Sequence, residues 1–151
     1  MADFFPEEDA TAVANLKKAG GILLGKTNLT EFALAGSQRY SPNRNPWDLD
    51  RFTGGSSAGS GSATAAFLCS TSLGEDTGGS IRRPAAWCGL AGLRPSWGRV
   101  SRYGVMPGSW SMDQVGPISR TAEDAAITLG AIAGYDPKDP YSSKAPVPDY
   151  R

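Results

Sequence analysis

The chain has 151 residues, and its 15 Lys and Arg residues balance 15 Asp and Glu residues. This balance excludes the strongly basic surface that nucleic acids or anionic membranes select, and no apolar run reaches the roughly 18 residues of a transmembrane helix. Two cysteines are too few for a disulfide framework or a zinc site. With no signal-peptide pattern at the N-terminus, we expect a cytoplasmic protein.

In the first third of the chain the pattern predicts a helix over Pro6–Ala19. Acidic residues crowd its first turn and two lysines occupy its last, an order that suits the helix dipole. The apolar run Gly21–Gly25 predicts a short buried strand. A second helix is expected to begin at Thr27 or Asn28, and the turn-rich residues 36–54 predict a long loop.

The middle and last thirds of the chain also predict helices that alternate with strands. Small residues over Ser57–Leu68 predict a buried helix that packs close to its neighbours, and Cys69–Gly74 predicts a strand. Thr121 is a good N-cap for a helix that Gly134 closes, and the proline-rich residues 135–151 predict a loop or a disordered tail. Alternating helices and strands indicate the α/β class within one domain.

Residues Gly20–Thr27 match the phosphate-loop pattern G-x-x-x-x-G-K-[ST]. That pattern functions when a strand precedes it and a flexible loop presents backbone amides. Here a predicted helix precedes it, and its interior is Ile22-Leu23-Leu24. Nucleotide binding is therefore the weaker alternative, and the end of a buried strand is the stronger one.

Histidine is absent from the sequence. Its absence excludes, within this chain, a Ser-His-Asp or Cys-His mechanism and a histidine-ligated metal. A serine nucleophile would need another base, and lysine is the main candidate.

Two glycine-serine segments are predicted to meet at one end of the fold. A helix over Ser57–Leu68 rises about 18 Å, and a strand over Cys69–Gly74 spans about 20 Å in return. Because these lengths nearly cancel, Ser56 and Ser80 are expected to lie close together. In "DTGGS", Gly78 and Gly79 permit backbone angles that point successive N–H groups at one spot, as in an oxyanion hole; a plain glycine turn is the alternative.

Taken together, these segments resemble the amidase signature family. "GGSSAGSGSATAA" is similar to its glycine-serine loop, "LGEDTGGSIRRPAAWCGLAGLRPS" to its core signature, and "WSMDQVGPISRTAEDAA" to a flanking segment. The resemblance implies an α/β/α sandwich with a mixed β-sheet and a Ser-Ser-Lys triad. We expect residues 1–151 to be an internal fragment of one such domain, with residues 135–151 as its proline-rich tail.

Carried over by motif, the resemblance implies that Ser80 is the nucleophile and that Ser56, after a cis peptide bond from Gly55, is the bridging serine. The backbone N–H groups of Thr77, Gly78, Gly79 and Ser80 would form the oxyanion hole. The supporting residues around the site would be Gly55, Ser57, Asp76 and Arg82.

The catalytic lysine of the family lies in a segment before the glycine-serine loop that this chain does not match. We therefore expect the chain alone to be inactive. Lys17, Lys18 and Lys26 do not match that lysine, and the first two are expected on a solvated helix face.

The resemblance implies hydrolysis of a small carboxylic amide to an acid and ammonia or an amine, without a metal or cofactor. A second branch of the family, the A subunit of the tRNA-dependent amidotransferase, releases ammonia from glutamine with the same triad. "LLGKTN", "NPWDL" and "GRVSRYG" resemble that branch. A homodimer is the partner expectation for the first branch and amidotransferase subunits for the second, with no direct binding of nucleic acid or membrane.

Overall fold

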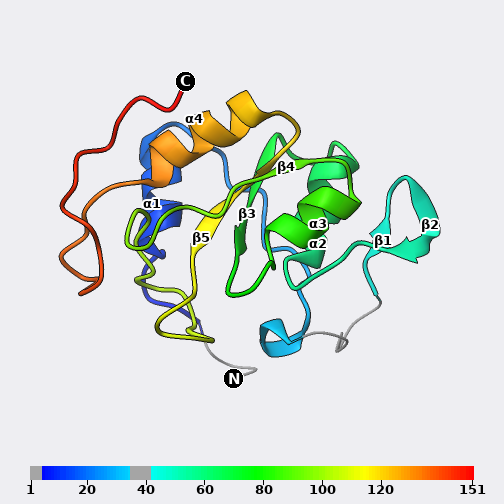
Figure 1. The fold of residues 1–151 in the computed structure, drawn as a ribbon, viewed down its shortest axis with the longest axis horizontal. Coiled ribbons are helices and arrows are strands. Elements are labelled where there is room, and N and C mark those ends of the chain that lie inside the picture. The colour runs from blue at the N-terminus through cyan, green and yellow to red at the C-terminus, as the bar shows by residue number, and fades with distance from the viewer. Residues whose placement is uncertain (1–4, 35–41) are drawn as a thin grey trace.

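The computed structural model describes residues 5–34 and 42–151. Its centre is an antiparallel sheet with the strand order β3-β5-β4, in which β5 lies between its two neighbours. Figure 1 shows α4 crossing this sheet and α2 and α3 lying beside it. The bounds are β3 Thr71–Glu75, β4 Ala91–Gly92, β5 Val115–Ser119, α2 Ala58–Ala65, α3 Arg82–Trp87 and α4 Ala122–Ile132.

Successive side chains of β3 contact different helices. The Thr128 hydroxyl on α4 donates to the Thr71 hydroxyl across 3.1 Å, whereas the next residue, Ser72, is hydrogen-bonded to Thr64 on α2 across 2.8 Å. Because neighbouring residues of a strand face opposite sides of its sheet, α4 and α2 lie on opposite faces. The expected α/β/α layering is therefore confirmed, and every pairing among the described strands is antiparallel.

Each face of the sheet has its own apolar core. On the α4 side, buried side chains of α1, β5 and α4 pack together; on the α3 side, a smaller cluster joins α3 to β5. Strand β5 is buried along its whole length because both faces are covered. The two clusters are Ala12, Val100, Val115, Leu129 and Ile132, and Ile81, Ala85 and Ile118.

Helix α2 confirms the predicted buried helix of small residues, although it ends three residues earlier, at Ala65. The Gly59 N–H donates to the Asn28 carbonyl across 2.7 Å, and a Cβ at Gly59 would overlap the Asn28 backbone. A Cβ at Gly61 would lie 3.0 Å from the Pro84 ring. The small side chains thus permit the chain to pass directly against the helix.

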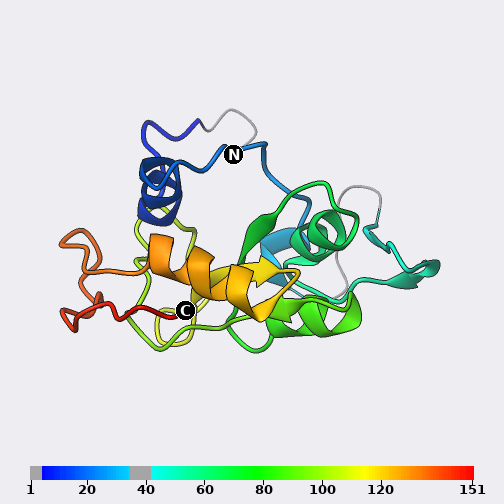
Figure 2. The ribbon, with the colours of Figure 1, turned by 90° about the horizontal axis from the view of Figure 1, so that it is seen from above.

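The first and last predicted helices are also present. Helix α1 covers Thr11–Lys18, with the acidic residues of the prediction preceding its first turn. Helix α4 begins after Thr121, whose hydroxyl accepts the N–H of Asp124 across 3.0 Å. This is the N-cap that the sequence predicts. Figure 2 shows α1 beside one end of α4, and the two helices are in contact.

Three predictions for residues 21–54 are wrong or incomplete. Gly21–Gly25 forms no strand, and Ile22 and Leu24 are 87% and 73% exposed, because no described strand pairs with this segment. The helix expected from Thr27 or Asn28 is only the 3-10 turn η1, Glu31–Ala33. The predicted loop contains the hairpin β1 (Arg44–Asn45) and β2 (Asp48–Phe52), which projects from the body in Figure 1; its residues 36–41 lie outside the described residues.

Helix α3 and strands β4 and β5 were not predicted. Pro84 lies in the first turn of α3, where its missing N–H costs no helix hydrogen bond. Residues 135–151 form turns and irregular segments in the structure, and the Ser143 N–H donates to the Gly98 carbonyl across 2.8 Å. Among the described residues no helix is long and apolar enough to cross a membrane.

Candidate active site

The loop before α2 and the loop before α3 meet at one end of β3. The N–H of Ser57 donates to the carbonyl oxygen of Ser80 across 3.2 Å, and the N–H of Thr30 donates to the carbonyl of Ser56 across 3.1 Å. The Gly55–Ser56 peptide bond is cis, as the resemblance implies. The predicted convergence of Ser56 and Ser80 is therefore confirmed as geometry, while their chemical roles remain predictions.

The side chains of Ser56 and Ser80 are almost buried, with 4% and 6% of each residue exposed. Neither hydroxyl makes a hydrogen bond within the described part of the chain. Neither serine oxygen belongs to the fully buried side-chain atoms without a hydrogen bond, which among the described residues are Thr30 Oγ1 and the two amide atoms of Gln114. The two serine hydroxyls therefore lie at the same place without partners, and they are available to a substrate or to another side chain.

The "DTGGS" loop presents backbone donors beside Ser80. Gly79 has φ +120°, a conformation that side chains disfavour. Its N–H donates to Asp76 across 2.6 Å, so it is already occupied, in contrast to the four-donor prediction. The N–H groups of Thr77, Gly78 and Ser80 donate to no acceptor within residues 5–34 and 42–151. Three backbone donors of this loop are thus free to bind a negatively charged oxygen.

The side chain of Asp76 is hydrogen-bonded to the backbone of this loop. Its carboxylate is fully buried and accepts the N–H groups of Gly79, Ile81 and Arg82. The Arg82 guanidinium adds two hydrogen bonds of 3.1 Å. Burial alone raises the pKa of Asp76, but the hydrogen bonds from Arg82 and the backbone outweigh it and lower that pKa to about 2. Asp76 is consequently a carboxylate at every pH near neutrality.

Arg94, which the sequence interpretation did not select, supports the same carboxylate. Its Nε donates to the backbone carbonyl of Asp76 across 3.1 Å and lies 3.4 Å from Oδ1 of the same residue. Its other nitrogen donates to the carbonyl of Met112 across 2.6 Å. Arg94 therefore connects the "DTGGS" loop to the segment before β5.

Ser57 links the two glycine-serine loops to the sheet. Its hydroxyl donates to the carbonyl of Glu75 across 3.3 Å and accepts the N–H of Glu75 across 3.2 Å. A Cβ at Gly74 would lie 2.7 Å from this hydroxyl, so glycine is what permits the approach. Ser57 thus bonds to the end of β3 at the point where the "DTGGS" loop begins.

No lysine within the described residues bonds to Ser56 or Ser80. Two lysines pair with surface carboxylates instead, Lys17 with Asp9 across 2.7 Å and Lys138 with Glu8 across 2.8 Å. No hydrogen bond joins any other lysine of the described residues to either serine.

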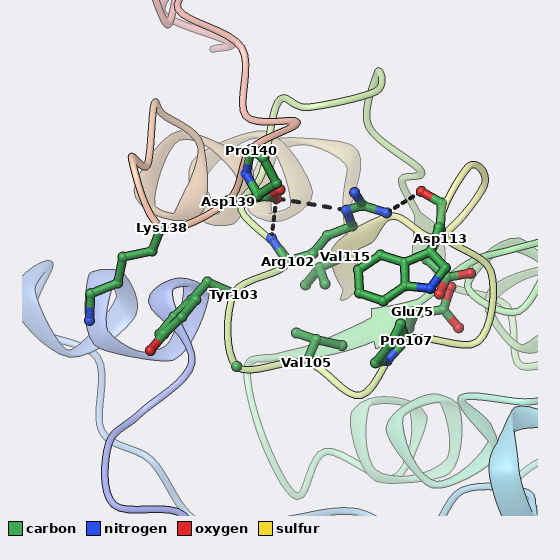
Figure 3. A pocket seen from close by; sticks show the side chains of 12 residues that line it. Glu75, Arg102, Tyr103, Val105, Pro107, Asp113, Val115, Lys138, Asp139 and Pro140 are labelled. Atoms are coloured by element: carbon green, nitrogen blue, oxygen red, sulfur yellow. Dashed lines mark hydrogen bonds and ion pairs between the residues drawn. The ribbon is translucent and has the colours of Figure 1, made fainter.

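A third feature lies next to the loop and was not selected from the sequence. The hydroxyl of Thr77 is 2.6 Å from Asp113 Oδ1 and 2.9 Å from Glu75 Oε1. Both carboxyls line a cavity of about 330 Å³ (Figure 3). Asp113 belongs to the segment before β5, so no local sequence signal indicated that it would reach Thr77.

The phosphate-loop pattern Gly20–Thr27 does not adopt the structure that nucleotide binding requires. Helix α1 precedes it, no helix begins at Lys26 or Thr27, and the residues between have no regular secondary structure and are exposed. The hydroxyl of Thr27 is hydrogen-bonded to Ser60 on α2 across 3.0 Å. This segment therefore ends in contact with α2, and it does not form the loop of backbone amides that binds phosphate. No group of His, Cys, Asp or Glu within the described residues has the arrangement of a metal site.

The sequence of the whole chain, residues 1–151, matches the family model described as Amidase. The chain belongs to the amidase family. Among curated amidase-family relatives, the A subunit of the glutamyl-tRNA(Gln) amidotransferase of Syntrophobacter fumaroxidans is 55% identical, over 100% of this chain and 32% of its own length. The corresponding protein of Synechococcus elongatus is also 55% identical, over 99% and 32%.

Solved structures of the amidase family share the fold closely. The A subunit of the glutamyl-tRNA(Gln) amidotransferase of Thermotoga maritima has a TM-score of 0.93 at 44% identity, over 96% of this chain and 33% of its own. The native peptide amidase of Stenotrophomonas maltophilia has a TM-score of 0.86 at 40% identity, over 97% and 32%. This amidase chain thus spans about a third of the length of the relatives it matches.

Proposed function

We propose that the protein containing these residues hydrolyses carboxylic amides through an acyl-enzyme on Ser80. The observation that supports this most strongly is the meeting of two unpartnered serine hydroxyls, from two largely buried residues, beside three unpartnered N–H groups. A nucleophile and a set of oxyanion donors are the two parts that acyl transfer requires.

In this mechanism the Ser80 oxygen attacks the amide carbonyl carbon and forms the new C–O bond. Its proton passes to Ser56, whose own proton passes to a neutral lysine outside the described residues. The carbonyl oxygen becomes an oxyanion that the N–H groups of Thr77, Gly78 and Ser80 stabilise. The C–N bond then breaks as the leaving nitrogen takes the proton, and water releases the acid by the reverse sequence of proton transfers.

Glutamine is the substrate that the relatives favour. The curated relatives reported above, at 55% identity, are amidotransferase A subunits; among solved structures the amidotransferase A subunit has 44% identity and a TM-score of 0.93, against 42% and 0.86 for a peptide amidase. We therefore infer that the amide is the side chain of glutamine and that the ammonia is passed to a partner protein. Hydrolysis of other small amides is the alternative, and comparing turnover of glutamine with that of a simple aryl amide separates the two.

The test uses a full-length chimera, in which residues 1–151 replace the matching third of the Thermotoga maritima protein. Labelling by a fluorophosphonate probe and amide turnover are expected to disappear in Ser80→Ala and to persist in Ser70→Ala, which removes an exposed serine hydroxyl. Persistent labelling of Ser80→Ala refutes the assignment. The 151-residue chain alone is expected to give no turnover, since it places no lysine on either serine.

A further inference from the structure

Thr77 contacts two carboxyls with one hydroxyl. Its oxygen lies 2.6 Å from Asp113 Oδ1 and 2.9 Å from Glu75 Oε1, and both distances are those of hydrogen bonds. A threonine hydroxyl has a single proton to donate, whereas an ionised carboxylate only accepts. If both carboxyls were ionised, one of the two contacts would join an oxygen lone pair to a negative oxygen. One carboxyl therefore carries a proton.

The hydrogen bonds identify which carboxyl is protonated. Asp113 Oδ2 accepts the N–H groups of Gly108 and Ser109 across 2.7 and 2.8 Å, and such donors favour the charged form of a carboxyl. No backbone N–H within the described ranges donates to the Glu75 carboxyl, which is partly buried. The proton therefore belongs on Glu75.

We propose that Glu75 is a positioning residue that works in its protonated form: its carboxyl donates to Thr77, Thr77 donates to Asp113, and this chain of hydrogen bonds fixes the start of the "DTGGS" loop. The hydrogen-bond chain stands on the geometry alone. Only its importance for catalysis rests on the proposed function, since Thr77 is one of the three free backbone donors beside Ser80.

The electrostatic surroundings favour this protonation state. Burial raises the pKa of Glu75 to about 7, and the charges of Asp113 and Asp76 add to this; a hydrogen bond that Thr77 donates to the ionised form acts in the opposite direction. A hydrogen bond between the Glu75 and Asp113 carboxyls also raises this pKa. The other charged or titratable side chains around the cavity are Arg102, Tyr103, Lys138 and Asp139.

The cations of the cavity are bound to other groups. Arg102 donates to the carbonyl of Trp110 across 2.8 Å and lies 3.7 Å from the carboxylate of Asp139, and Figure 3 shows the Arg102–Asp139 contact as a dashed line. Lys138 pairs with Glu8 on the surface. Within residues 5–34 and 42–151, neither cation forms an ion pair with Glu75, so the proton of Glu75 is what satisfies the contact with Thr77.

Loss of this proton changes the loop. As the pH rises through about 7, Glu75 ionises and stands beside two other carboxylates, Asp76 and Asp113. Thr77 then has one proton for two carboxylates and loses one of its two hydrogen bonds. The start of the loop is held less firmly, so its N–H groups lose their fixed direction.

The decisive measurement is a carbon-detected NMR titration of the 151-residue chain, with Glu75 assigned by its absence in Glu75→Gln. The Glu75 carboxyl is expected to titrate near pH 7, and the amide signal of Thr77 to shift with the same midpoint. In Glu75→Gln the Thr77 shift disappears, because the glutamine amide donates at every pH. The control variant Glu123→Gln, which changes an exposed residue of α4, leaves the pH-dependent shift of the Thr77 signal unchanged. A Glu75 midpoint near 4.3, the ordinary glutamate value, overturns the proposal, and so does a Thr77 signal that stays constant through pH 7.

If the amide proton signals of the isolated chain have the narrow chemical-shift dispersion of an unfolded peptide, the chimera is used instead. Its amide turnover is followed against pH in the parent and in Glu75→Gln. The ratio of variant to parent activity is expected to rise severalfold between about pH 6 and pH 9, since only the parent loses its proton. A ratio that stays constant refutes the positioning role. Failure of the proposed function is distinct, because it appears as unchanged labelling of Ser80→Ala and leaves the NMR titration as predicted.

Discussion

The backbone of Ser57 is hydrogen-bonded to the backbone of Ser80 across 3.2 Å, and through this contact the loop before α2 is held against the loop before α3. The hydroxyl of Ser57 at the same time bonds to both polar backbone groups of Glu75. One serine therefore sets the position of Ser56, of Ser80 and of the last residue of β3.

Removal of the Ser56 hydroxyl is predicted to slow acylation without unfolding the protein. Ser56→Ala in the chimera removes the proposed proton bridge, and general acid–base catalysis of this kind contributes about 10²–10⁴-fold. The hydroxyl makes no hydrogen bond within the described residues, so the melting temperature is expected to change little. Single-turnover labelling gives the rate and thermal unfolding gives the control. A rate within about threefold of the parent, well below that range, would contradict the bridging role.

Asp76→Asn is predicted to destabilise the fold at neutral pH. The buried carboxylate accepts hydrogen bonds from the loop backbone and from Arg82, and the loss of one hydrogen bond to a charged group costs about 1.5–3 kcal/mol. Because the pKa of Asp76 is lowered to about 2, its stabilisation is complete above the unfolded value of about 3.9. It is lost as the pH falls through about 2.

Urea unfolding of the parent and of Asp76→Asn at several pH values checks this prediction. The difference in unfolding free energy is expected to be largest near pH 7 and to shrink between about pH 4 and pH 2. Asp149→Asn, which changes an exposed aspartate, is the control and is expected to have little effect. A difference that is the same at pH 7 and pH 2 would refute the electrostatic origin.

Two glycine-to-alanine changes in helices are predicted to have opposite signs. In α2, a Cβ at Gly59 would overlap the Asn28 backbone, so Gly59→Ala forces the chain apart and costs about 1–3 kcal/mol. In α4, nothing lies within 4 Å of a Cβ at Gly130, and Gly130→Ala is expected to stabilise by about 0.5–1 kcal/mol. Thermal unfolding of the two variants measures both effects, and destabilisation by both would show that helix packing does not explain the difference.

Solubility of the 151-residue chain is predicted to be limited by the exposed run after α1. Ile22 and Leu24 are mostly exposed, and an apolar, uncharged extended segment promotes association between chains. The double change Ile22→Thr and Leu24→Thr is expected to raise the concentration at which aggregates appear. Because these side chains have few contacts to lose, the unfolding free energy should stay within about 0.5 kcal/mol of the parent. Light scattering against concentration is the measurement, and the double change Ala14→Thr and Ala19→Thr on exposed positions at α1 is the control.

The sequence predicted the meeting of Ser56 and Ser80 although the bounds of the connecting elements differ. The helix is shorter than predicted and the strand begins two residues later, at Thr71. The prediction succeeded because it needed only the direction and approximate length of the two elements, and these follow from composition and spacing.

Other features were beyond sequence reasoning for physical reasons. Gly116 and Pro117 weaken the strand signal in β5, and only burial between two neighbouring strands makes it a strand. The contact of Thr77 with Asp113 joins residues far apart in the chain and depends on how β5 pairs with β3. In the Ile22 to Leu24 run the apolar pattern indicated burial, but it contained no information about which partner would provide it.

Because the chain passes directly against α2, substitutions are tolerated differently in two parts of this protein. At Gly59 a side chain would overlap the Asn28 backbone, and at Gly61 it would press against the Pro84 ring, so substitutions at these positions are expected to destabilise the protein. The exposed residues around the cavity, such as Pro107 and Trp110, have no such constraint on one side. Variants that alter the surface of the protein should therefore be sought at the rim of the cavity, with the helix left unchanged.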